Sequence, residues 1–416
     1  MDAYDGARYY VRRMKRNTLL IVLVVVAGAF LVLNPLQLFN RNAGTPRRPA
    51  LEAARLAPML SYAESSWRSP EEYILSAFAR HDVVLLGEFF KIRQNVKLVQ
   101  DLIPRLYAVG IRNLGIEYAL SDDQGEIDAL LTAPAWDESR ARAITFHWLV
   151  TWGYQEYIDL YRAAWQVNKG RPAGAKPFRI VGLNVRQNWE SLKEQNDLGN
   201  PKVVASIFAQ GVPDAHMADV IDSEFTRTGE KALVFCGTQH IFTRYRSRVY
   251  EKNAAEMKLP ETRRAGNIVY ERIGSRVFAI SLHAPWPDPT QKTGLAYPVD
   301  GAVDALIDAL PAEKRSAGWD TAGTPLGALP LGRSPYSDGA QTGTLADLFD
   351  GYVVQGPISA YAMVTLIRDF IQPADAERAG REFPGVKPAS PPTVEQLNQT
   401  IVDDVDSLAK ALAQFQ

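Results

Sequence analysis

Short apolar runs alternate with amphipathic segments along most of the chain. The runs are bounded by turn-forming residues and are apolar at consecutive positions: Asp82–Glu88, Asn113–Glu117, Arg179–Asn184, Lys231–Cys236, Arg276–Leu282 and, more weakly, Gly351–Gln355. Strands that are apolar on both faces are typical of a sheet covered by helices on both sides. Between the first two runs, residues 95–108 place apolar side chains at helical spacing. This β-α-β alternation predicts an α/β domain with a mainly parallel sheet and helices on both faces.

The main domain is expected at residues 58–372. Its clearest helix start is Ser69-Pro70-Glu71-Glu72, where an N-cap serine precedes a proline and two acids. Residues 284–344 are rich in Pro and Gly and lack periodicity, apart from a short helix near Val303–Leu310. A loop of that length is either a lid over a binding site or a disordered insert.

The C-terminal residues 393–416 predict one amphipathic helix after a Pro-rich linker at 373–392. Thr393 and Gln396 have the spacing of a capping box. Apolar positions then recur every three or four residues: Val394, Leu397, Ile401, Val405, Leu408, Leu412 and Phe415. This apolar face needs a partner, which is either the domain itself or a second copy of the chain through self-association.

The N-terminus carries an uncharged and strongly apolar segment at residues 17–40. As a helix it is long enough to cross the hydrocarbon core of a bilayer, roughly 30 Å thick, and would contact membrane lipid. Residues 1–16 are more basic than residues 41–48, which predicts that residues 1–16 are cytoplasmic. The domain, after a tether at residues 41–57, is then extracytoplasmic, and periplasmic in a Gram-negative cell. The alternative is a cleaved signal peptide.

Composition excludes two classes of protein. Lys and Arg (46) nearly balance Asp and Glu (47), and no basic stripe follows the apolar segment, so nucleic acid is not an expected partner. Cys236 is the single cysteine, so the chain cannot build an internal disulfide or a thiolate zinc site.

Two carboxylates end neighbouring apolar runs. Glu88 closes the first run and Glu117 closes the second. If the two strands are parallel neighbours, both side chains emerge at one edge of the sheet, where ligands of open α/β sheets bind. Nearby acids raise one another's pKa, which suits a general acid or base. The alternative is that each carboxylate caps a helix or pairs with an arginine.

Other polar residues are expected at the same edge. His240 follows the fourth run on a turn opened by Gly237, and is the strongest single candidate for a site residue. Asn184 ends the third run and would hold a ligand or satisfy the turn. His216, at a helix start, would either reach the site or lie on the surface. Trp152 and Tyr157 belong to an aromatic series that would form core or line the site of a flat apolar ligand.

The order of these motifs resembles the superfamily of the erythromycin esterases, the ChaN-like haem-binding proteins and the TIKI and TraB group. The resemblance rests on Leu86-Gly87-Glu88, Ile116-Glu117 and Gly237-Thr238-Gln239-His240, and on the order of their strands. It implies that Glu88, Glu117 and His240 line an active or ligand site. Phe90 stands where the superfamily has the histidine of Gly-Glu-x-His. In the resembling proteins that histidine is the general base or a metal ligand, and phenylalanine can be neither.

Three functions follow from this pattern. The first is a membrane-anchored domain that binds a small molecule, with haem held through His240 or a tyrosine as one form. The second is a divergent ester or amide hydrolase that uses Glu88 and Glu117 with His240. The third is an envelope scaffold protein with a relic pocket. A divalent metal is the other cofactor considered, with Glu88, Glu117 and His240 as its ligands, and this oxygen-rich set favours manganese or magnesium over zinc.

Overall fold

The computed structural model describes residues 46, 48, 51–194, 197, 199–287, 294–332, 334, 336, 343–384 and 392–415. The predicted basic tail at 1–16 and the predicted membrane segment at 17–40 lie outside these residues. Among the helices that the structure does describe, none is both long and apolar enough to cross a membrane.

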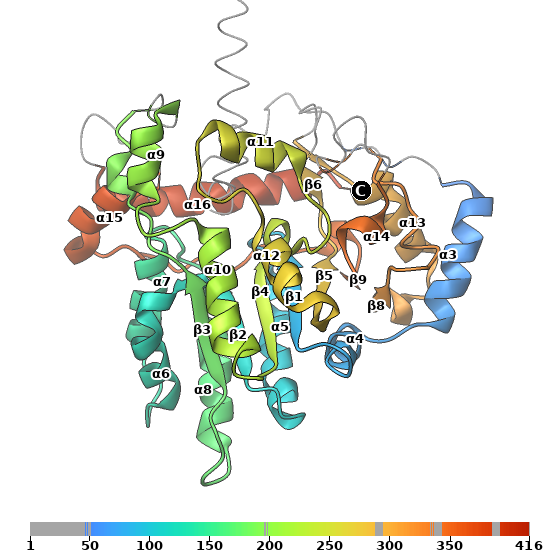
Figure 1. The fold of residues 1–416 in the computed structure, drawn as a ribbon, viewed down its shortest axis with the longest axis horizontal. Helices are drawn as coiled ribbons and strands as arrows, with labels where there is room; N and C mark the ends of the chain where they lie inside the picture. Colours follow the sequence, from blue (N-terminus) through green and yellow to red (C-terminus); the bar gives the residue numbers. More distant parts are fainter. Residues whose placement is uncertain are drawn as a thin grey trace, which may run out of the picture.

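A mainly parallel sheet forms the centre of the molecule (Figure 1). Within the described residues its strand order is β3-β2-β4-β1-β5-β9-β8, and β8 pairs antiparallel with β9 while the other pairs are parallel. The prediction of a mainly parallel α/β sheet is confirmed. The strands are β1 (Val83–Glu88), β2 (Asn113–Leu120), β3 (Arg179–Asn184), β4 (Ala232–Gly237), β5 (Val277–Leu282), β8 (Ser316–Asp320) and β9 (Gly351–Gln355).

Helices cover both faces of this sheet. Successive side chains of a strand point to opposite faces, and they join a different hydrophobic cluster on each face. In β1, Val84 and Leu86 belong to one cluster, whereas Val83 and Leu85 belong to the other. The first cluster takes side chains from α4 (Pro70–Ala77), α5 (Arg93–Ala108), α6 (Gln124–Thr132), α7 (Glu138–Trp148), α8 (Gln155–Gly170) and α15 (Ala376–Glu382). The second takes them from α3 (Ala53–Ser65), α10 (Pro213–Ile221), α12 (Ala265–Ile273), α13 (Ala302–Ala309) and α14 (Leu345–Leu348). A satellite cluster joins α9 (Pro201–Ile207) to α11 (Arg248–Glu256).

The strand order corrects one expectation. β1 and β2 are not neighbours, because β4 lies between them and pairs with both. Glu117 also does not end its strand, since β2 continues to Leu120 after a register shift against β3. All three strands are parallel, so Glu88 and Glu117 still lie toward the same edge of the sheet, on either side of β4.

Residues 284–344 contain more regular structure than a loop or lid. The described part includes the small strand pair β6 (Trp286–Pro287) and β7 (Leu295–Ala296), helix α13, and strand β8 at the edge of the main sheet. β8 is short and contains Gly318, where an added Cβ would lie 2.4 Å from the ring of Tyr73. Because glycine is required at this position, β8 (Ser316–Asp320) has no continuous apolar run. The other strands were predicted from such runs, so β8 was not predicted.

The predicted C-terminal helix is present as α16 (Val394–Leu412). Its capping box forms as expected, with the Gln396 N–H donating to the Thr393 hydroxyl at 3.2 Å. Its apolar face packs on the domain, where Leu397 and Ile401 join the cluster on one face of the sheet and Leu408 joins a cluster near the sheet's end. Figure 1 shows α16 (red) running across one end of the sheet. Self-association through residues 393–416 stays a prediction.

Candidate functional site

The carboxyl group of Glu88 is buried at the end of β1. Its Oε1 accepts hydrogen bonds from the hydroxyls of Tyr157, at 2.9 Å, and of Tyr118. Its Oε2 has no hydrogen-bond partner among the described residues. Burial raises the pKa of Glu88 well above its usual value, and the charge of Glu117 adds to this, while the two tyrosine hydroxyls oppose it. Burial thus favours the neutral, protonated form of this acid.

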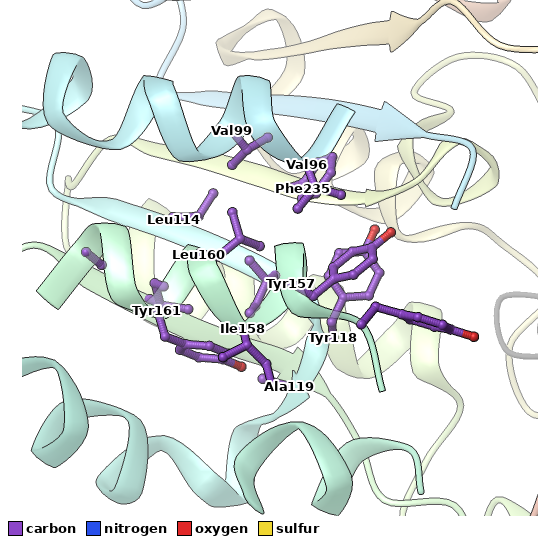
Figure 2. Packing of buried hydrophobic residues seen from close by; sticks show 14 of the residues in the cluster. Val96, Val99, Leu114, Tyr118, Ala119, Tyr157, Ile158, Leu160, Tyr161 and Phe235 are labelled. Carbon is purple, nitrogen blue, oxygen red and sulfur yellow. The ribbon is translucent and has the colours of Figure 1, made fainter. Parts of the chain in front are cut away.

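An aromatic cluster fixes the two tyrosines that hold Glu88. Tyr118 comes from β2 and Tyr157 from α8, with ring centroids 4.7 Å apart, and Figure 2 shows them side by side. Trp152 stacks on Tyr118 at 5.6 Å, and Phe90 meets both Tyr118 and Trp152 edge-on. Packing of this kind leaves the rings few alternative rotamers. The aromatic series is thus mostly core, and its function at the site is to aim the hydroxyls at Glu88.

A row of alternating charges begins at Glu117. Its Oε2 accepts the backbone N–H of Gly237 at 2.8 Å, and its Oε1 lies 3.5 Å from Nε2 of His240. On the other side of the ring, Nδ1 of His240 lies 2.7 Å from Oδ1 of Asp214. Burial alone would lower the pKa of His240, but the charges of Asp214 and Glu117 outweigh it and raise this pKa to about 10. The imidazole is therefore a cation held between two carboxylates.

Asp214 is satisfied by several donors. Besides His240, its oxygens accept the Ala265 N–H at 2.8 Å, the Tyr250 hydroxyl at 3.2 Å and the Arg264 guanidinium at 3.1 Å. Burial opposes ionisation, but the charges of His240 and Arg264 outweigh it and lower the pKa of Asp214. The guanidinium of Arg264 also lies over the Tyr250 ring, 3.3 Å from its centroid, and donates to Gln239 at 2.7 Å.

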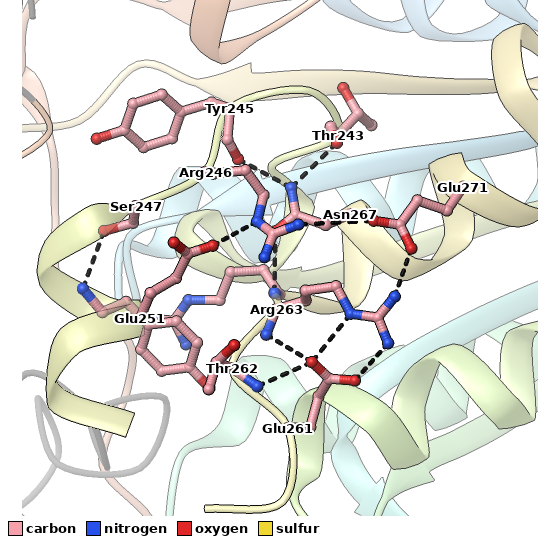
Figure 3. Close-up of polar contacts among 12 residues, drawn as sticks. Thr243, Tyr245, Arg246, Ser247, Glu251, Glu261, Thr262, Arg263, Asn267 and Glu271 are labelled. Atoms are coloured by element: carbon pink, nitrogen blue, oxygen red, sulfur yellow. Dashed lines mark hydrogen bonds and ion pairs between the residues drawn. The ribbon is translucent and has the colours of Figure 1, made fainter. Parts of the chain in front are cut away.

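The segment that carries Arg264 is held by its own network, shown in Figure 3. Arg263 donates to both oxygens of Glu261, at 2.9 and 2.6 Å, and also pairs with Glu271. Asn267 donates to the backbone carbonyls of Thr243 and Tyr245 at 3.0 and 2.8 Å. These contacts fix the backbone on both sides of Arg264, so that its side chain reaches Asp214.

Phe90 occupies space next to Gly237 and Glu117. A Cβ added to Gly237 would lie 2.6 Å from Cζ of Phe90 and 3.5 Å from Oε2 of Glu117. The phenyl ring is 6% exposed and packs against Tyr118 and Trp152. The position where the resembling superfamily carries a histidine is therefore filled by an apolar side chain that is part of the core.

Two cavities meet at His240. The Glu88 cavity, about 520 Å³ including space open to solvent, is lined by Glu88, His240 and a mainly apolar set that includes Phe89, Leu282, Ala284 and Trp286. The Asp214 cavity, about 620 Å³ by the same measure, is lined by Glu117, Asp214, His240, Arg264 and aromatic side chains that include Trp148 and Tyr250. His240 thus lies between the mainly apolar Glu88 cavity and the more polar Asp214 cavity.

The remaining sequence candidates have different positions. Asn184 lines the Asp214 cavity, donates to the Glu117 carbonyl at 3.2 Å and accepts from the Val185 N–H at 2.9 Å. His216 lines neither cavity and instead meets Ser121, with Nε2 2.7 Å from its hydroxyl. Trp152 is fully buried behind Glu88 and lines neither cavity.

The site residues fit neither haem ligation by His240 nor a compact metal centre. An axial imidazole must offer a nitrogen lone pair to the iron, whereas His240 is protonated and both of its nitrogens face carboxylates. Within the described residues, no three His, Cys, Asp or Glu side chains are grouped closely enough to hold a metal ion. The arrangement instead offers a neutral carboxylic acid on one side and a buried cation on the other.

Comparison with known proteins finds similarity in structure only. No protein-family model and no curated protein matches the sequence of the chain. Among solved structures, a succinoglycan biosynthesis protein has a TM-score of 0.51 at 11% identity, over 76% of this chain and all (100%) of that one. An erythromycin esterase mutant in its open conformation has a TM-score of 0.44 at 14% identity, over 74% and 96%. ChaN of Campylobacter jejuni with cofacial haem has a TM-score of 0.34 at 15% identity, over 53% of this chain and 89% of that one.

At such identities the similarity concerns the fold. The chain is a parallel α/β protein with the architecture of the first of these structures. Membership of the superfamily that its motifs resemble stays a prediction, and the functional argument rests on the geometry of the site.

Several site residues were not predicted from the sequence. Tyr118 directly follows Glu117 but lies beyond the predicted run Asn113–Glu117, whereas the strand continues to Leu120. Arg264 precedes a helix without any motif around it. Lys91 and Asp404, which form a buried pair, lie 313 positions apart in the sequence. Adjacency to a strand-end acid could have identified Tyr118, whereas the other three depend on tertiary contacts.

Proposed function

We propose that this chain is a membrane-anchored, extracytoplasmic protein whose domain binds a small molecule in the Glu88 cavity. The expected ligand has an aromatic or other apolar body and a hydrogen-bond acceptor such as a carbonyl group. Anchoring and location rest on the apolar segment at residues 17–40 and the basic residues before it.

The observation that carries the binding proposal is the buried and unpartnered Oε2 of Glu88, a residue that lines a mainly apolar cavity. Because Oε1 already accepts two tyrosine hydroxyls, the proton of the neutral acid belongs on Oε2. A buried donor without an acceptor costs about 1–3 kcal/mol. A ligand carbonyl would remove that cost, and the apolar lining, which includes Trp286 and Leu282, would bury the ligand's body.

Replacing Glu88 tests this proposal with coumarin, a non-ionisable aromatic lactone, as the probe. Glu88→Gln keeps a donor in place, so the affinity should stay within about threefold of the wild type. Glu88→Ala removes the donor and should weaken binding roughly fivefold to tenfold. The measurement is isothermal titration calorimetry of the full chain, with the exposed Glu64→Ala as control. Absence of saturable binding by the wild type, or equal affinity in Glu88→Ala, would contradict the proposal.

A hydrolase is the second candidate, and the raised pKa of Glu88 favours it because a general acid must be protonated at working pH. Glu117 is then the carboxylate available as base, with His240 holding it. Umbelliferyl acetate, an ester with the coumarin core, distinguishes the two functions. Turnover by the wild type that is abolished in Glu88→Gln would identify a hydrolase, since the amide can donate a hydrogen bond but cannot transfer a proton. Binding without turnover would identify a ligand-binding domain.

A further inference from the structure

A buried ion pair joins the loop after β1 to the C-terminal helix. Lys91 lies three residues beyond Glu88, is 2% exposed and pairs through Nζ with Oδ2 of Asp404 in α16. Asp404 also accepts the Tyr154 hydroxyl at 2.9 Å. The Lys91 ammonium lies 5.3 Å from the ring centroid of Trp152 and 5.4 Å from that of Tyr154. Among the described residues, Asp404 is the carboxylate paired with this buried cation.

The backbone of Lys91 is in an unusual conformation. Its φ of 68° lies in the left-handed region, which costs a non-glycine residue about 1–2 kcal/mol. In this conformation its N–H donates to the Tyr157 hydroxyl at 3.1 Å, and that hydroxyl donates to Glu88 at 2.9 Å. A continuous series of contacts therefore runs from Asp404 through Lys91 and Tyr157 to the carboxyl group in the cavity.

α16 also packs against the wall of the Glu88 cavity. Leu408, Leu412 and Phe415 belong to one hydrophobic cluster with Ala284, and Phe89 packs on that cluster. Ala284 and Phe89 both line the Glu88 cavity. α16 is thus connected to the site in two ways, through the pair of Asp404 with Lys91 and through the hydrophobic cluster that it shares with the cavity-lining Ala284.

We propose that Asp404 is a positioning residue for Glu88. By holding Lys91 in its left-handed conformation, it keeps the Tyr157 hydroxyl on the Glu88 carboxyl group. The cavity then has its binding geometry only while α16 is docked. The positioning rests on these contacts, and its effect on a ligand rests on the proposed function.

Replacing Lys91 and Asp404 by apolar residues distinguishes an effect on the position of the Glu88 carboxyl group from an effect on the stability of the fold. Lys91→Met with Asp404→Leu removes both charges, and such replacements of a buried pair are often neutral or stabilising. It also removes the side-chain contact by which we propose that Asp404 supports the positive φ of residue 91, whose backbone N–H and C=O are also bonded to Tyr157 and Val364. If the pair served only to stabilise α16, this double variant would restore the site together with the fold.

Two readouts are compared in the full chain. The first is the infrared C=O stretch of protonated Glu88, taken as the difference between each variant and the same variant with Glu88→Gln, in mildly acidic buffer. The second is the affinity for coumarin. We expect the double variant to melt within a few degrees of the wild type, to shift the Glu88 band as Tyr157→Phe does, and to bind coumarin about threefold more weakly, a smaller loss than in Glu88→Ala.

A folded double variant with the wild-type Glu88 band would overturn the proposal, even if coumarin binding were lost. If the wild type binds no coumarin but the double variant shifts the band, the positioning stands and the proposed ligand function falls. Should the double variant not fold, Asp404→Glu keeps both charges, displaces Lys91, and should shift the band in the same direction; an unshifted band would overturn the proposal. Asp406→Asn, on the exposed side of α16, is the control and should change neither readout.

Discussion

At the residue scale, the site contains two acids whose surroundings give them opposite charge states. Glu88 faces hydroxyls and apolar side chains, and burial therefore raises its pKa and keeps the acid neutral. Asp214 faces Arg264 and His240, whose charges lower its pKa and keep it ionised. Neutral and charged groups are thereby separated within one buried region, and His240 marks the boundary because it lines both cavities.

His240 should make the stability of the domain depend on pH. Its pKa is raised from 6.5 to about 10, so the folded state holds a proton that the unfolded state releases in this interval. The resulting stabilisation is fully present below pH 6.5 and is lost as the pH rises through about 10. We expect the melting temperature of the wild type to fall over this range, and that of His240→Gln to start lower and fall less steeply.

The measurement is thermal unfolding followed by circular dichroism across that interval. His147→Gln is the matched control, because the His147 side chain is 34% exposed and lines neither cavity. Parallel curves for the wild type and His240→Gln would show that the proton on His240 does not contribute to stability.

At the element scale, most strands could be predicted because each is a short run buried on both faces. The bounds of β3 and β9 match the sequence prediction, β1 and β5 differ from it by one residue at one end, and β4 differs by one residue at both ends. Strand order could not be predicted, since the position of β4 between β1 and β2 depends on how helices cross the sheet rather than on any local pattern.

The sequence likewise predicts only part of the site. Glu88, Glu117 and His240 come together because parallel strands place their carboxyl ends at one edge. Their partners could not be predicted in this way, because Asp214 and Arg264 begin helices, and Lys91 and Asp404 meet across 313 residues. The pattern of apolar runs therefore predicts which edge of the sheet carries the site. It does not predict which charged side chains surround the residues at that edge.

Position 237, the last residue of β4, is expected to tolerate only glycine. Gly237→Ala would place a Cβ 2.6 Å from Phe90, whose ring is held by Tyr118 and Trp152 and cannot move aside easily. We expect a loss of about 1–3 kcal/mol in the free energy of unfolding, measured by urea denaturation. Gly125→Ala in α6 is the control, because no atom lies within 4 Å of its added Cβ, and helix propensity should stabilise it by up to about 1 kcal/mol. Equal stability of the wild type and Gly237→Ala would show that Phe90 can be displaced.

At the scale of the whole molecule, the predicted membrane anchor can be tested separately from the domain. The full chain should stay in the membrane pellet after alkaline carbonate extraction, because residues 17–40 would be buried in lipid. Deletion of residues 1–40 should release the domain into the supernatant with its circular dichroism spectrum unchanged. Extraction of the full chain by carbonate would contradict anchoring, and protection of the domain from protease added to spheroplasts would contradict its extracytoplasmic location.

The contact between Lys91 and Asp404 also sets an order of events during synthesis. A ribosome adds about 5–20 residues per second, so Asp404, which lies 313 positions after Lys91, is added on the order of 15–60 s later. During that time the strands around Glu88 can assemble, but the Lys91 ammonium has no counter-ion from α16. In a nascent chain that stops short of Asp404, Lys91 lacks the carboxylate with which it pairs in the folded domain. α16, which is translated long after β1, thus completes the site at the end of β1, and chains truncated before Asp404 are expected to be degraded faster by cellular proteases.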